Sequence, residues 1–159
     1  MNRNFRRLVI VAVVFEACLD IRTNDEHIFE DGAERGRLPQ YIEEYDRVKD
    51  DPDQKRRLLD RIIRDFDSAG ERDKLMAERN YKLAVPQFRK ETGKIQFLLP
   101  IYLDDAAKID RPQCALVLSR DDSGQQPHYY GETILTLDMA YNNARLIAKP
   151  DVFWLNNLI

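Results

Sequence analysis

The strongest constraint on the fold is a change of hydrophobic period between the two halves of the chain. In the segment 94–103, alternate residues are apolar and share one face: Ile95, Phe97, Leu99, Ile101 and Leu103. An alternation of this kind predicts a β-strand. Further strands are predicted over Cys114–Ser119 and Tyr129–Leu137, with a turn at 121–124 between them. Because the connections are short, we expect an antiparallel meander.

A proline disturbs the first of these strands. Pro100 lies on the face opposite the alternating apolar residues of segment 94–103. Proline has no backbone N–H to donate to a neighbouring strand, so it is largely confined to edge strands and bulges. We therefore expect this strand to lie at an edge of the sheet or to contain a bulge.

The middle of the chain follows a helical period instead. A helix is plausible from Gln40 to about Val48, ending before Asp50-Asp51-Pro52. Pro52 is then a good start signal for a second helix over Asp53–Phe66. The apolar residues of that segment fall on one side of a helix: Leu58, Leu59, Ile62, Ile63 and Phe66. This spacing predicts an amphipathic helix that packs against the sheet.

Two breaks are expected around these helices. Ser68-Ala69-Gly70 predicts the end of the second helix, and a third is expected over Glu71–Leu83 with Leu75, Met76 and Leu83 facing inward. The charged run from Asp31 to Pro39 is typical of a loop, because it begins with an Asp-Gly pair.

The beginning of the chain combines a basic segment with an apolar one. Leu8–Phe15 is an unbroken apolar run rich in β-branched residues, which favours a buried strand; a targeting signal is the alternative, since residues 1–7 are basic. Eight residues are too few to cross a membrane, so we expect no membrane association. Glu16–Arg22 alternates polar and apolar residues, which predicts a half-buried strand.

Together these elements predict an α+β fold. We expect one domain over residues 1–159, with an antiparallel β-meander in the C-terminal half packed against two or three helices and a strand near the N-terminus. The formal net charge is −3, so no overall positive field attracts nucleic acid. Cys18 and Cys114 form no metal-binding pattern, and we expect two buried, reduced thiols in a cytoplasmic protein, with no metal and no cofactor.

The first candidate site is the segment Gly131–Leu146, whose pattern predicts a strand followed directly by a short helix. Asp138 is expected to cap this helix through the amides that follow it. The candidate ligand-binding residues on the helix are Asp138, Tyr141, Asn142 and Arg145. Three of them share a face at spacings of four and seven, and the guanidinium of Arg145 suits a carboxylate or phosphate. The alternative is that these polar residues only fix neighbouring loops.

Two further groups of candidates lie elsewhere. Arg22, Asn24 and His27 follow a predicted strand, and His27 could serve as a general base. Arg79 and Asn80 lie at a predicted helix end, where a cation could bind phosphate or simply complement the helix dipole. A structural role is the alternative for both groups.

Several segments resemble a known family. They are Asn80–Phe88, Lys94–Pro100, Gly131–Leu146, Ala148–Asp151 and Trp154-Leu155. They are similar to a family known only as a domain of unknown function, best over Arg79–Leu155 and more loosely over Leu19–Pro39. Its members often lie beside LOTUS (OST-HTH) or cold-shock modules, which implies an RNA-linked context by association. The resemblance does not extend before Glu16, where family members usually have a further portion, so a protein partner that completes the domain is one expectation. It supplies no catalytic residues.

Three hypotheses follow for the function. The first is an accessory module of RNA-associated proteins that binds RNA, a nucleotide or a protein partner. The second is an enzyme acting on a nucleotide or phosphoester, with His27 as acid or base and Arg79 and Arg145 holding phosphate. The third is a purely structural or interaction domain. The sequence leaves open whether the protein is an enzyme.

Overall fold

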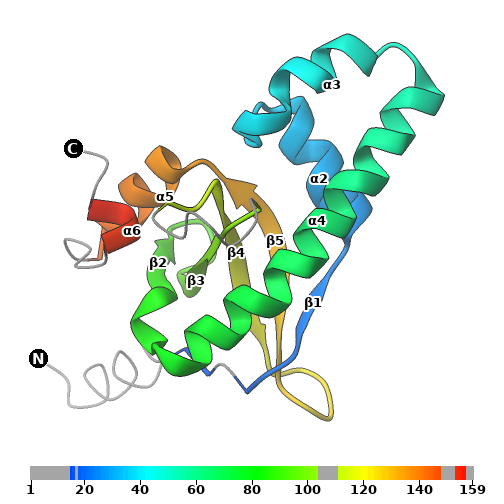
Figure 1. Cartoon of the computed structure of the whole chain (residues 1–159). Helices are drawn as coiled ribbons and strands as arrows, with labels where there is room; N and C mark the ends of the chain where they lie inside the picture. The colour runs from blue at the N-terminus through cyan, green and yellow to red at the C-terminus, as the bar shows by residue number, and fades with distance from the viewer. Residues whose placement is uncertain (1–14, 17, 104–110, 148–152, 157–159) are drawn as a thin grey trace, which may run out of the picture.

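The computed structural model describes residues 15–16, 18–103, 111–147 and 153–156. Within them, the strands form one sheet with the order β1-β5-β4-β3-β2 (Figure 1). The strands are β1 (Ile21–Thr23), β2 (Val85–Arg89), β3 (Lys94–Ile101), β4 (Cys114–Asp121) and β5 (His128–Leu135). Neighbours from β2 to β5 are antiparallel, which confirms the predicted meander, whereas β1 pairs with β5 in parallel.

The helices surround this sheet. They are α2 (Asp25–Glu34), α3 (Ile42–Val48), α4 (Pro52–Arg79), α5 (Leu137–Ala144) and α6 (Phe153–Asn156), with short 3₁₀ turns at Pro39–Tyr41 and Tyr81–Leu83. Figure 1 shows α4 crossing the sheet, with α2 and α3 at one end of the molecule and α5 and α6 at the other. The α+β class is therefore confirmed. The strand predicted over Leu8–Phe15 lies outside the described residues, apart from Phe15.

Helix α4 is continuous, so the predicted break at Ser68-Ala69-Gly70 is wrong. The helix begins where the Asp51 carboxylate accepts from the backbone N–H groups of Asp53 and Gln54. Ala69 is buried in the core, and packing over a long amphipathic helix outweighs the cost of about 1 kcal/mol for an internal glycine. One consequence is that Leu75, expected to face inward, is 55% exposed.

Helix α2 covers Asp31–Glu34, the first part of the segment predicted to be a loop. Its buried residues recur with helical spacing: Ile28, Phe29, Gly32 and Ala33. Gly32 is not a turn residue here, because it lies within α2. The Leu38 and Ile134 side chains pack beside it, 3.7 Å from the position that its Cβ would take. The charged residues between these positions occupy the exposed side of the helix, which is why the pattern resembled a loop.

The N-terminal strand is shorter than predicted. Of the segment Glu16–Arg22, the strand β1 includes Ile21 and Arg22 and then continues to Thr23. Cys18 lies before it and is exposed, so the prediction of two buried thiols is wrong for Cys18 and right for Cys114. Both cysteines are free.

Strand β2 was not predicted, and its presence corrects the expectation for Pro100. Strand β3 lies between β2 and β4, so it is not an edge strand. The last β2–β3 pair is Val85 with Leu98, whereas Pro100 pairs with Ala115 of β4. Pro100 is tolerated because β2 has ended before this position, so that no ladder partner needs its missing N–H.

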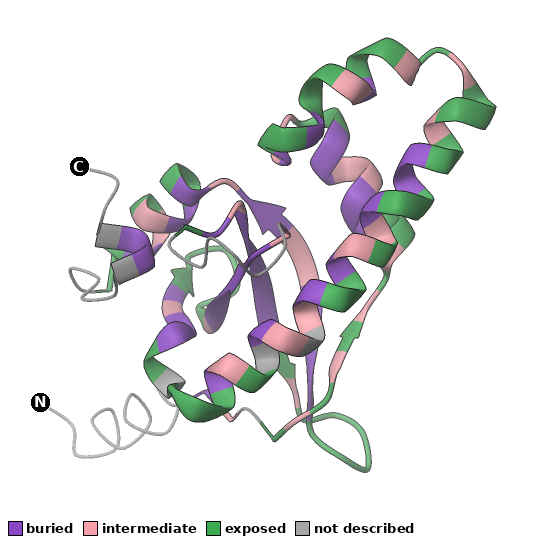
Figure 2. Cartoon of the chain, in the orientation of Figure 1, coloured by how far each residue is buried: buried purple, intermediate pink, exposed green. Residues whose placement is uncertain are grey.

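The core lies mainly between α4 and the sheet. Figure 2 shows buried residues along the central strands and on part of α4. Phe66 of α4 meets Phe29 of α2 edge to face, with ring centroids 4.5 Å apart. Phe15 stacks on Tyr129 of β5, with ring centroids 4.9 Å apart. Within the described residues, the structure has no helix with the length and apolar character needed to cross a bilayer.

Candidate functional site

The helix that carries the first candidate site is α5, and its cap differs from the prediction. Thr136 is the N-cap residue, and its Oγ1 accepts from the backbone N–H of Met139 at 3.4 Å. Asp138 lies within the first turn and is exposed. The prediction that Asp138 caps the helix is therefore wrong, because the strand ends one residue before Thr136 and the helix begins directly after it.

The exposed face of α5 does contain the predicted residues. Asp138, Asn142 and Arg145 are all exposed, as their spacing predicted. The Arg145 guanidinium carbon lies 5.8 Å from the ring centroid of Tyr141, so this arginine packs over its own helix. The role of this face in ligand binding stays a prediction.

The predicted site residues do not gather in one place. Arg22 lines a cavity of about 420 Å³ between β1 and α4, Asp138 lines one of about 450 Å³, and His27 lines one of about 680 Å³. Asn24 precedes α2 without a side-chain capping bond. At the C-terminal end of α4, Asn80 caps the helix, and its Oδ1 accepts a hydrogen bond of 3.2 Å from the Lys82 N–H.

The largest of these three cavities lies over one face of the sheet, and we call it the sheet-face cavity. Its lining comes from α2 and the loop after it, the β2–β3 hairpin, β4, β5 and the end of α5. The residues are His27, Asp31, Arg35, Arg37, Gln87, Phe88, Arg89, Lys90, Glu91, Gln96, Val117, Glu132, Thr133, Leu135, Asn143 and Leu146. Gln96 and Val117 face away from α4, because Leu99 and Leu116, which line a cavity with Phe66, lie on the opposite face of the same strands. Gln87 shares the face of its partner Gln96, whereas Phe88 pairs with Ile95 and lies on the face of Leu99.

A row of hydrogen-bonded side chains crosses this face of the sheet, and we call it the polar row. It consists of Gln87, Gln96, Ser119 and Glu132, one from each strand of the meander. Gln87 Nε2 donates to Gln96 Oε1 at 3.0 Å, and Gln96 Nε2 donates to Ser119 Oγ at 2.8 Å. Ser119 Oγ in turn donates to Glu132 Oε1. Gln87 and Gln96 are only 5% and 3% exposed.

A β-bulge brings Glu132 into this row. Val117 pairs with Thr133, but the next residue, Leu118, pairs with Gly131, so that β5 has an extra residue at Glu132. A bulge interrupts the strict alternation of side chains and re-aims one of them. Glu132 therefore lies on the same side as Thr133 and reaches Ser119.

Cations surround the polar row, although several are already paired. Arg89 forms an ion pair with Glu132. Arg37 Nη1 donates to Thr133 Oγ1 at 2.9 Å and to the Ile134 carbonyl at 3.1 Å. Lys90, in the β2–β3 turn, has no ion pair or hydrogen bond with the described residues. It is an exposed cation available to an anionic group.

The comparisons with known proteins place the chain in a family. The model of a domain of unknown function, DUF3825, matches residues 8–154. The chain belongs to this family. The match contains every residue that lines the sheet-face cavity. It begins at residue 8, before Glu16, whereas the resemblance noted from the sequence does not extend before Glu16. The searches of curated proteins and of solved structures find no match.

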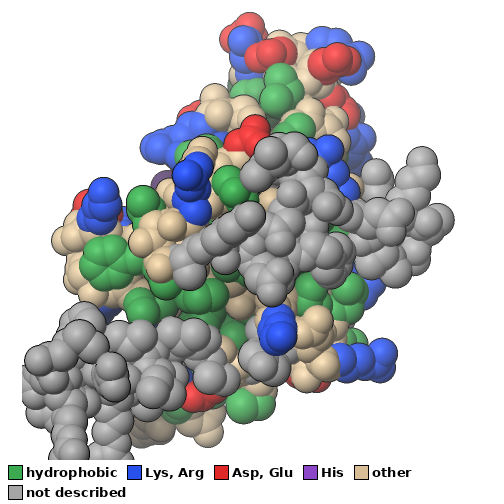
Figure 3. Space-filling view, turned by 90° about the vertical axis from the view of Figure 1, so that its left-hand side faces the viewer, with side chains coloured by type: hydrophobic (Ala, Val, Ile, Leu, Met, Phe, Trp, Pro, Cys, Tyr) green, Lys and Arg blue, Asp and Glu red, His purple; other side chains and the backbone are tan. Residues whose placement is uncertain are grey.

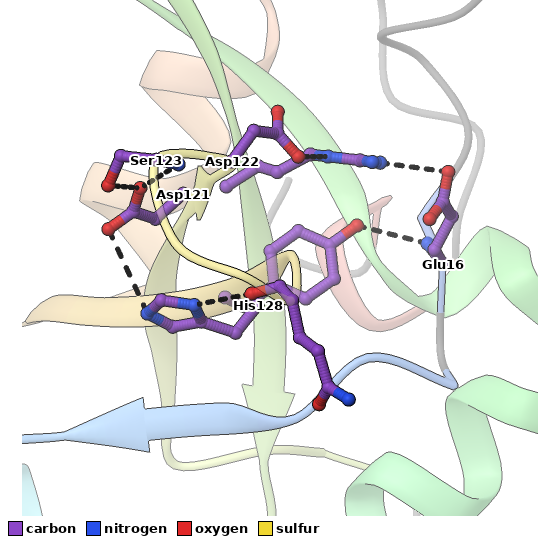
Figure 4. Close-up of polar contacts among 8 residues, drawn as sticks. Glu16, Asp121, Asp122, Ser123 and His128 are labelled. Carbon is purple, nitrogen blue, oxygen red and sulfur yellow. Dashed lines mark hydrogen bonds and ion pairs between the residues drawn. The ribbon is translucent and has the colours of Figure 1, made fainter.

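A second polar cluster of the DUF3825 chain lies at the β4–β5 hairpin (Figure 4). Arg120 forms ion pairs of 2.8 Å with both Glu16 and Asp122, and the Glu16 N–H donates to the Tyr129 hydroxyl at 3.0 Å. His128 Nε2 lies 3.8 Å from Asp121. These groups satisfy one another, so the cluster ties the segment before β1 to the hairpin and does not form a site.

No metal site is evident in the described part of the DUF3825 chain, where no group of three or more His, Cys, Asp or Glu side chains is arranged to hold an ion.

The polar row was not predicted from the sequence, because its members come from four separate strands. Gln96 gave one signal: it is a polar residue amid the apolar run Ile95–Ile101. A buried amide in such a strand needs a polar partner across the sheet.

Proposed function

We propose that this DUF3825 chain is a binding module that holds one nucleotide unit in the sheet-face cavity. The unit is either a free nucleotide or a residue of single-stranded RNA, which share the same chemistry. The observation that carries the proposal is a cavity of about 680 Å³ with buried amides on its floor and cations at its border. Cavities of this size suit a small organic ligand whose orientation is set by a few polar groups.

The two kinds of polar group fit the two ends of a nucleotide. Amide side chains can read the hydrogen-bonding edge of a base, as they do in complexes with nucleic acids. Lys90 and Arg89 at the hairpin suit a phosphate group.

The charge distribution favours a small unit over a long duplex. In the view of Figure 3, the Lys and Arg side chains of the described residues are scattered, several of them beside Asp or Glu, and they form no continuous patch. The whole chain has a net charge of −3. We therefore expect modest affinity that falls as salt is raised.

The cellular context of the proposal comes from the resemblance and from the cysteines. The family resembled occurs beside RNA-binding modules, which supports an RNA-associated role. Cys18 and Cys114 are both free, and free thiols are typical of a reducing compartment such as the cytoplasm.

The phosphoester-enzyme hypothesis is not supported in the form that the sequence suggested. His27 lines the sheet-face cavity, but Arg79 and Arg145 are not among its lining residues. None of the cavities described above is lined by all three groups, and we do not propose this reaction.

The test is a binding experiment on the full chain. AMP is titrated and followed by NMR chemical shifts, and a short 5′-labelled single-stranded RNA is followed by fluorescence anisotropy at low and physiological salt. We expect saturable binding, weakened about 5- to 10-fold by Lys90→Ala, which corresponds to one charge-assisted contact of about 1 kcal/mol.

Lys49→Ala is the matched control. Lys49 is an exposed lysine beyond α3 that lines a different cavity, and its removal should leave the affinity unchanged. Absence of saturable binding for both AMP and RNA would overturn the proposal and leave the structural or protein-partner hypotheses. Arg145→Ala in the same assay tests the exposed face of α5. A loss of affinity in Arg145→Ala with none in Lys90→Ala would argue for that face instead of the cavity.

A further inference from the structure

The face of the sheet that carries the polar row continues beyond the sheet-face cavity toward β1, the edge strand next to β5 (Figure 1). Tyr130 of β5 pairs directly with Ser119 of β4 on one side and with Arg22 of β1 on the other. Directly paired residues of neighbouring strands share a face of the sheet. Since Ser119 bonds to Gln96 on the face turned away from α4, Tyr130 and Arg22 lie on that face too.

The ring of Tyr130 is open to solvent on this face. Tyr130 is 43% exposed, whereas the preceding residue, Tyr129, is buried. The Tyr129 ring stacks on Phe15, and its hydroxyl accepts from the Glu16 N–H. By contrast, the Tyr130 side chain makes neither a hydrogen bond nor a ring contact with the described residues. Its ring is therefore available to a planar group from outside the fold.

Arg22 directs its side chain to the same face as Tyr130. A Cβ at Gly131 would lie beside Thr23 Cγ2 and Leu116 Cδ1, so Thr23 faces α4 together with Leu116. Side chains alternate along a strand, and Arg22 therefore points to the other face. The cavity of about 420 Å³ that Arg22 also lines includes every residue from Asp20 to Thr23, so it borders the free edge of β1 and not one face alone.

The Arg22 guanidinium is an unpaired cation beside the exposed ring. The side chain is exposed and forms no ion pair or hydrogen bond with the described residues. Neighbouring strands of a sheet lie about 4.7–4.9 Å apart, so Arg22 and the Tyr130 ring can contact one ligand together. The Glu132 carboxylate on this face is paired with Arg89, which reduces its repulsion of an anion.

A free aromatic ring and a free guanidinium suit one unit of a single-stranded nucleic acid. Aromatic side chains stack on any base, and the planar guanidinium matches a phosphate group. A base must leave its duplex before it can stack on a protein ring, which excludes paired RNA. Glu132, two residues after Tyr130, lines the sheet-face cavity. Two consecutive nucleotides can therefore occupy the cavity and the Tyr130 ring.

We propose that the ligand is single-stranded RNA of two or more nucleotides, with one base stacked on Tyr130, its phosphate beside Arg22 and the adjacent nucleotide in the sheet-face cavity. This inference rests on the proposed function and selects the second of its two forms, a residue of RNA instead of a free nucleotide. A mononucleotide fills only one of the two positions, so RNA must bind more tightly than AMP.

The first test compares AMP with pApA, the dinucleotide that carries the same 5′-phosphate. Both are titrated into the unmodified full chain and followed by NMR chemical shifts, so this comparison does not depend on any variant. We expect pApA to bind about 5- to 30-fold more tightly, the range of one stacked base.

Variants of Tyr130 test where the second base lies. Tyr130→Ala removes the ring, so the affinity for pApA should fall to that for AMP, while the affinity for AMP itself stays unchanged. Tyr130→Phe is the matched control, because it keeps the ring and removes only the hydroxyl, and it should keep the preference for pApA. Thermal unfolding confirms that each variant is folded before its affinities are compared.

A variant of Arg22 tests the phosphate contact. Arg22→Ala should weaken pApA binding about 3- to 10-fold and make it less dependent on salt, because one charge-assisted contact is lost. AMP binding should not change. Arg64→Ala is the control, since Arg64 is an exposed arginine of α4 that lines none of the cavities described above, and it should bind both ligands as the unmodified chain does.

The possible outcomes separate this inference from the proposed function. Equal affinities of the unmodified chain for AMP and pApA would overturn the inference while leaving nucleotide binding intact. A preference for pApA that survives Tyr130→Ala would also overturn it, because the second base would then lie elsewhere. Equal losses of AMP and pApA binding in Tyr130→Ala would contradict the two separate positions. Absence of binding by AMP, pApA and longer RNA overturns both proposals.

Discussion

The indole Nε1 of Trp154 donates a hydrogen bond of 3.1 Å to the backbone carbonyl of Leu83. Trp154 is 1% exposed and belongs to α6, whereas Leu83 ends the 3₁₀ turn that leads from α4 into β2. The bond therefore joins the last described helix to the start of the meander. Both residues lie in the segments that carry the family resemblance.

Replacing Trp154 by Phe should destabilise the protein. The substitution leaves the Leu83 carbonyl buried without its donor and removes part of a large buried ring, which together should lower the free energy of unfolding by about 2–4 kcal/mol. Trp154 is the sole tryptophan of the chain, so urea unfolding is followed by far-UV circular dichroism. An unchanged midpoint would show that this contact contributes little.

Gly131 is required by the close pairing of β1 with β5. A Cβ at this position would lie 2.6 Å from Thr23 Cγ2 and 3.3 Å from Leu116 Cδ1. We expect Gly131→Ala to lower the free energy of unfolding by about 1–3 kcal/mol through overpacking. Adding Thr23→Ser removes the nearest methyl group and should recover part of the loss. The steric explanation fails if the double variant is no more stable than Gly131→Ala, as measured by chemical denaturation.

Gly70 offers the opposite case within α4. No atom lies within 4 Å of the position that its Cβ would take. Because the helix continues through this residue, Gly70→Ala should stabilise the protein by about 0.5–1 kcal/mol. The same denaturation assay measures the gain. A neutral or destabilising result would favour the helix break that the sequence suggested at this point.

Asp73 should make stability depend on pH. Burial raises the pKa of its carboxyl from 3.8 to about 6, against the opposing effects of the Tyr102 N–H and of Arg72. The folded state then holds more protons than the unfolded state between pH 4 and 6, so this group's contribution to stability falls as pH rises through that window. The total change is about 2–3 kcal/mol.

The variant Asp73→Asn isolates this contribution. Asn keeps an oxygen that can accept from the Tyr102 N–H, the bond that Asp73 Oδ2 makes at 3.0 Å, but it does not titrate. We expect the stability of the variant relative to the unmodified protein to increase from pH 4 to pH 7, as measured by thermal or urea unfolding at each pH. A difference that is constant with pH would contradict the raised pKa.

The fold could be predicted where one local pattern determined an element. Alternation in segment 94–103 predicted β3 because one face of that strand is buried against α4. Alternation did not reveal β2, because this strand is short and contains Pro86. The end of α2 was predicted to be a loop, because Asp31-Gly32 suggested a turn. The parallel pairing of β1 with β5 also went unpredicted, since register between distant segments depends on tertiary packing.

The candidate site was predictable only in part. His27 lines the sheet-face cavity, and so does Asn143, the neighbour of the predicted Asn142, because consecutive residues point to different sides of α5. The polar row depends on cross-strand register and on a bulge at Glu132. Neither of these follows from residue spacing along a single strand.

The pairing of β1 with β5 has a consequence for how the chain folds as it is synthesised. Ile21 pairs with Tyr129, so β1 must wait until more than a hundred later residues have left the ribosome. The meander closes shorter loops and should form first, since loop-closure entropy rises with length. Until β1 docks, one edge of β5 is unpaired and can add a strand from another molecule. The nascent protein is therefore most exposed to aggregation immediately before β1 is placed.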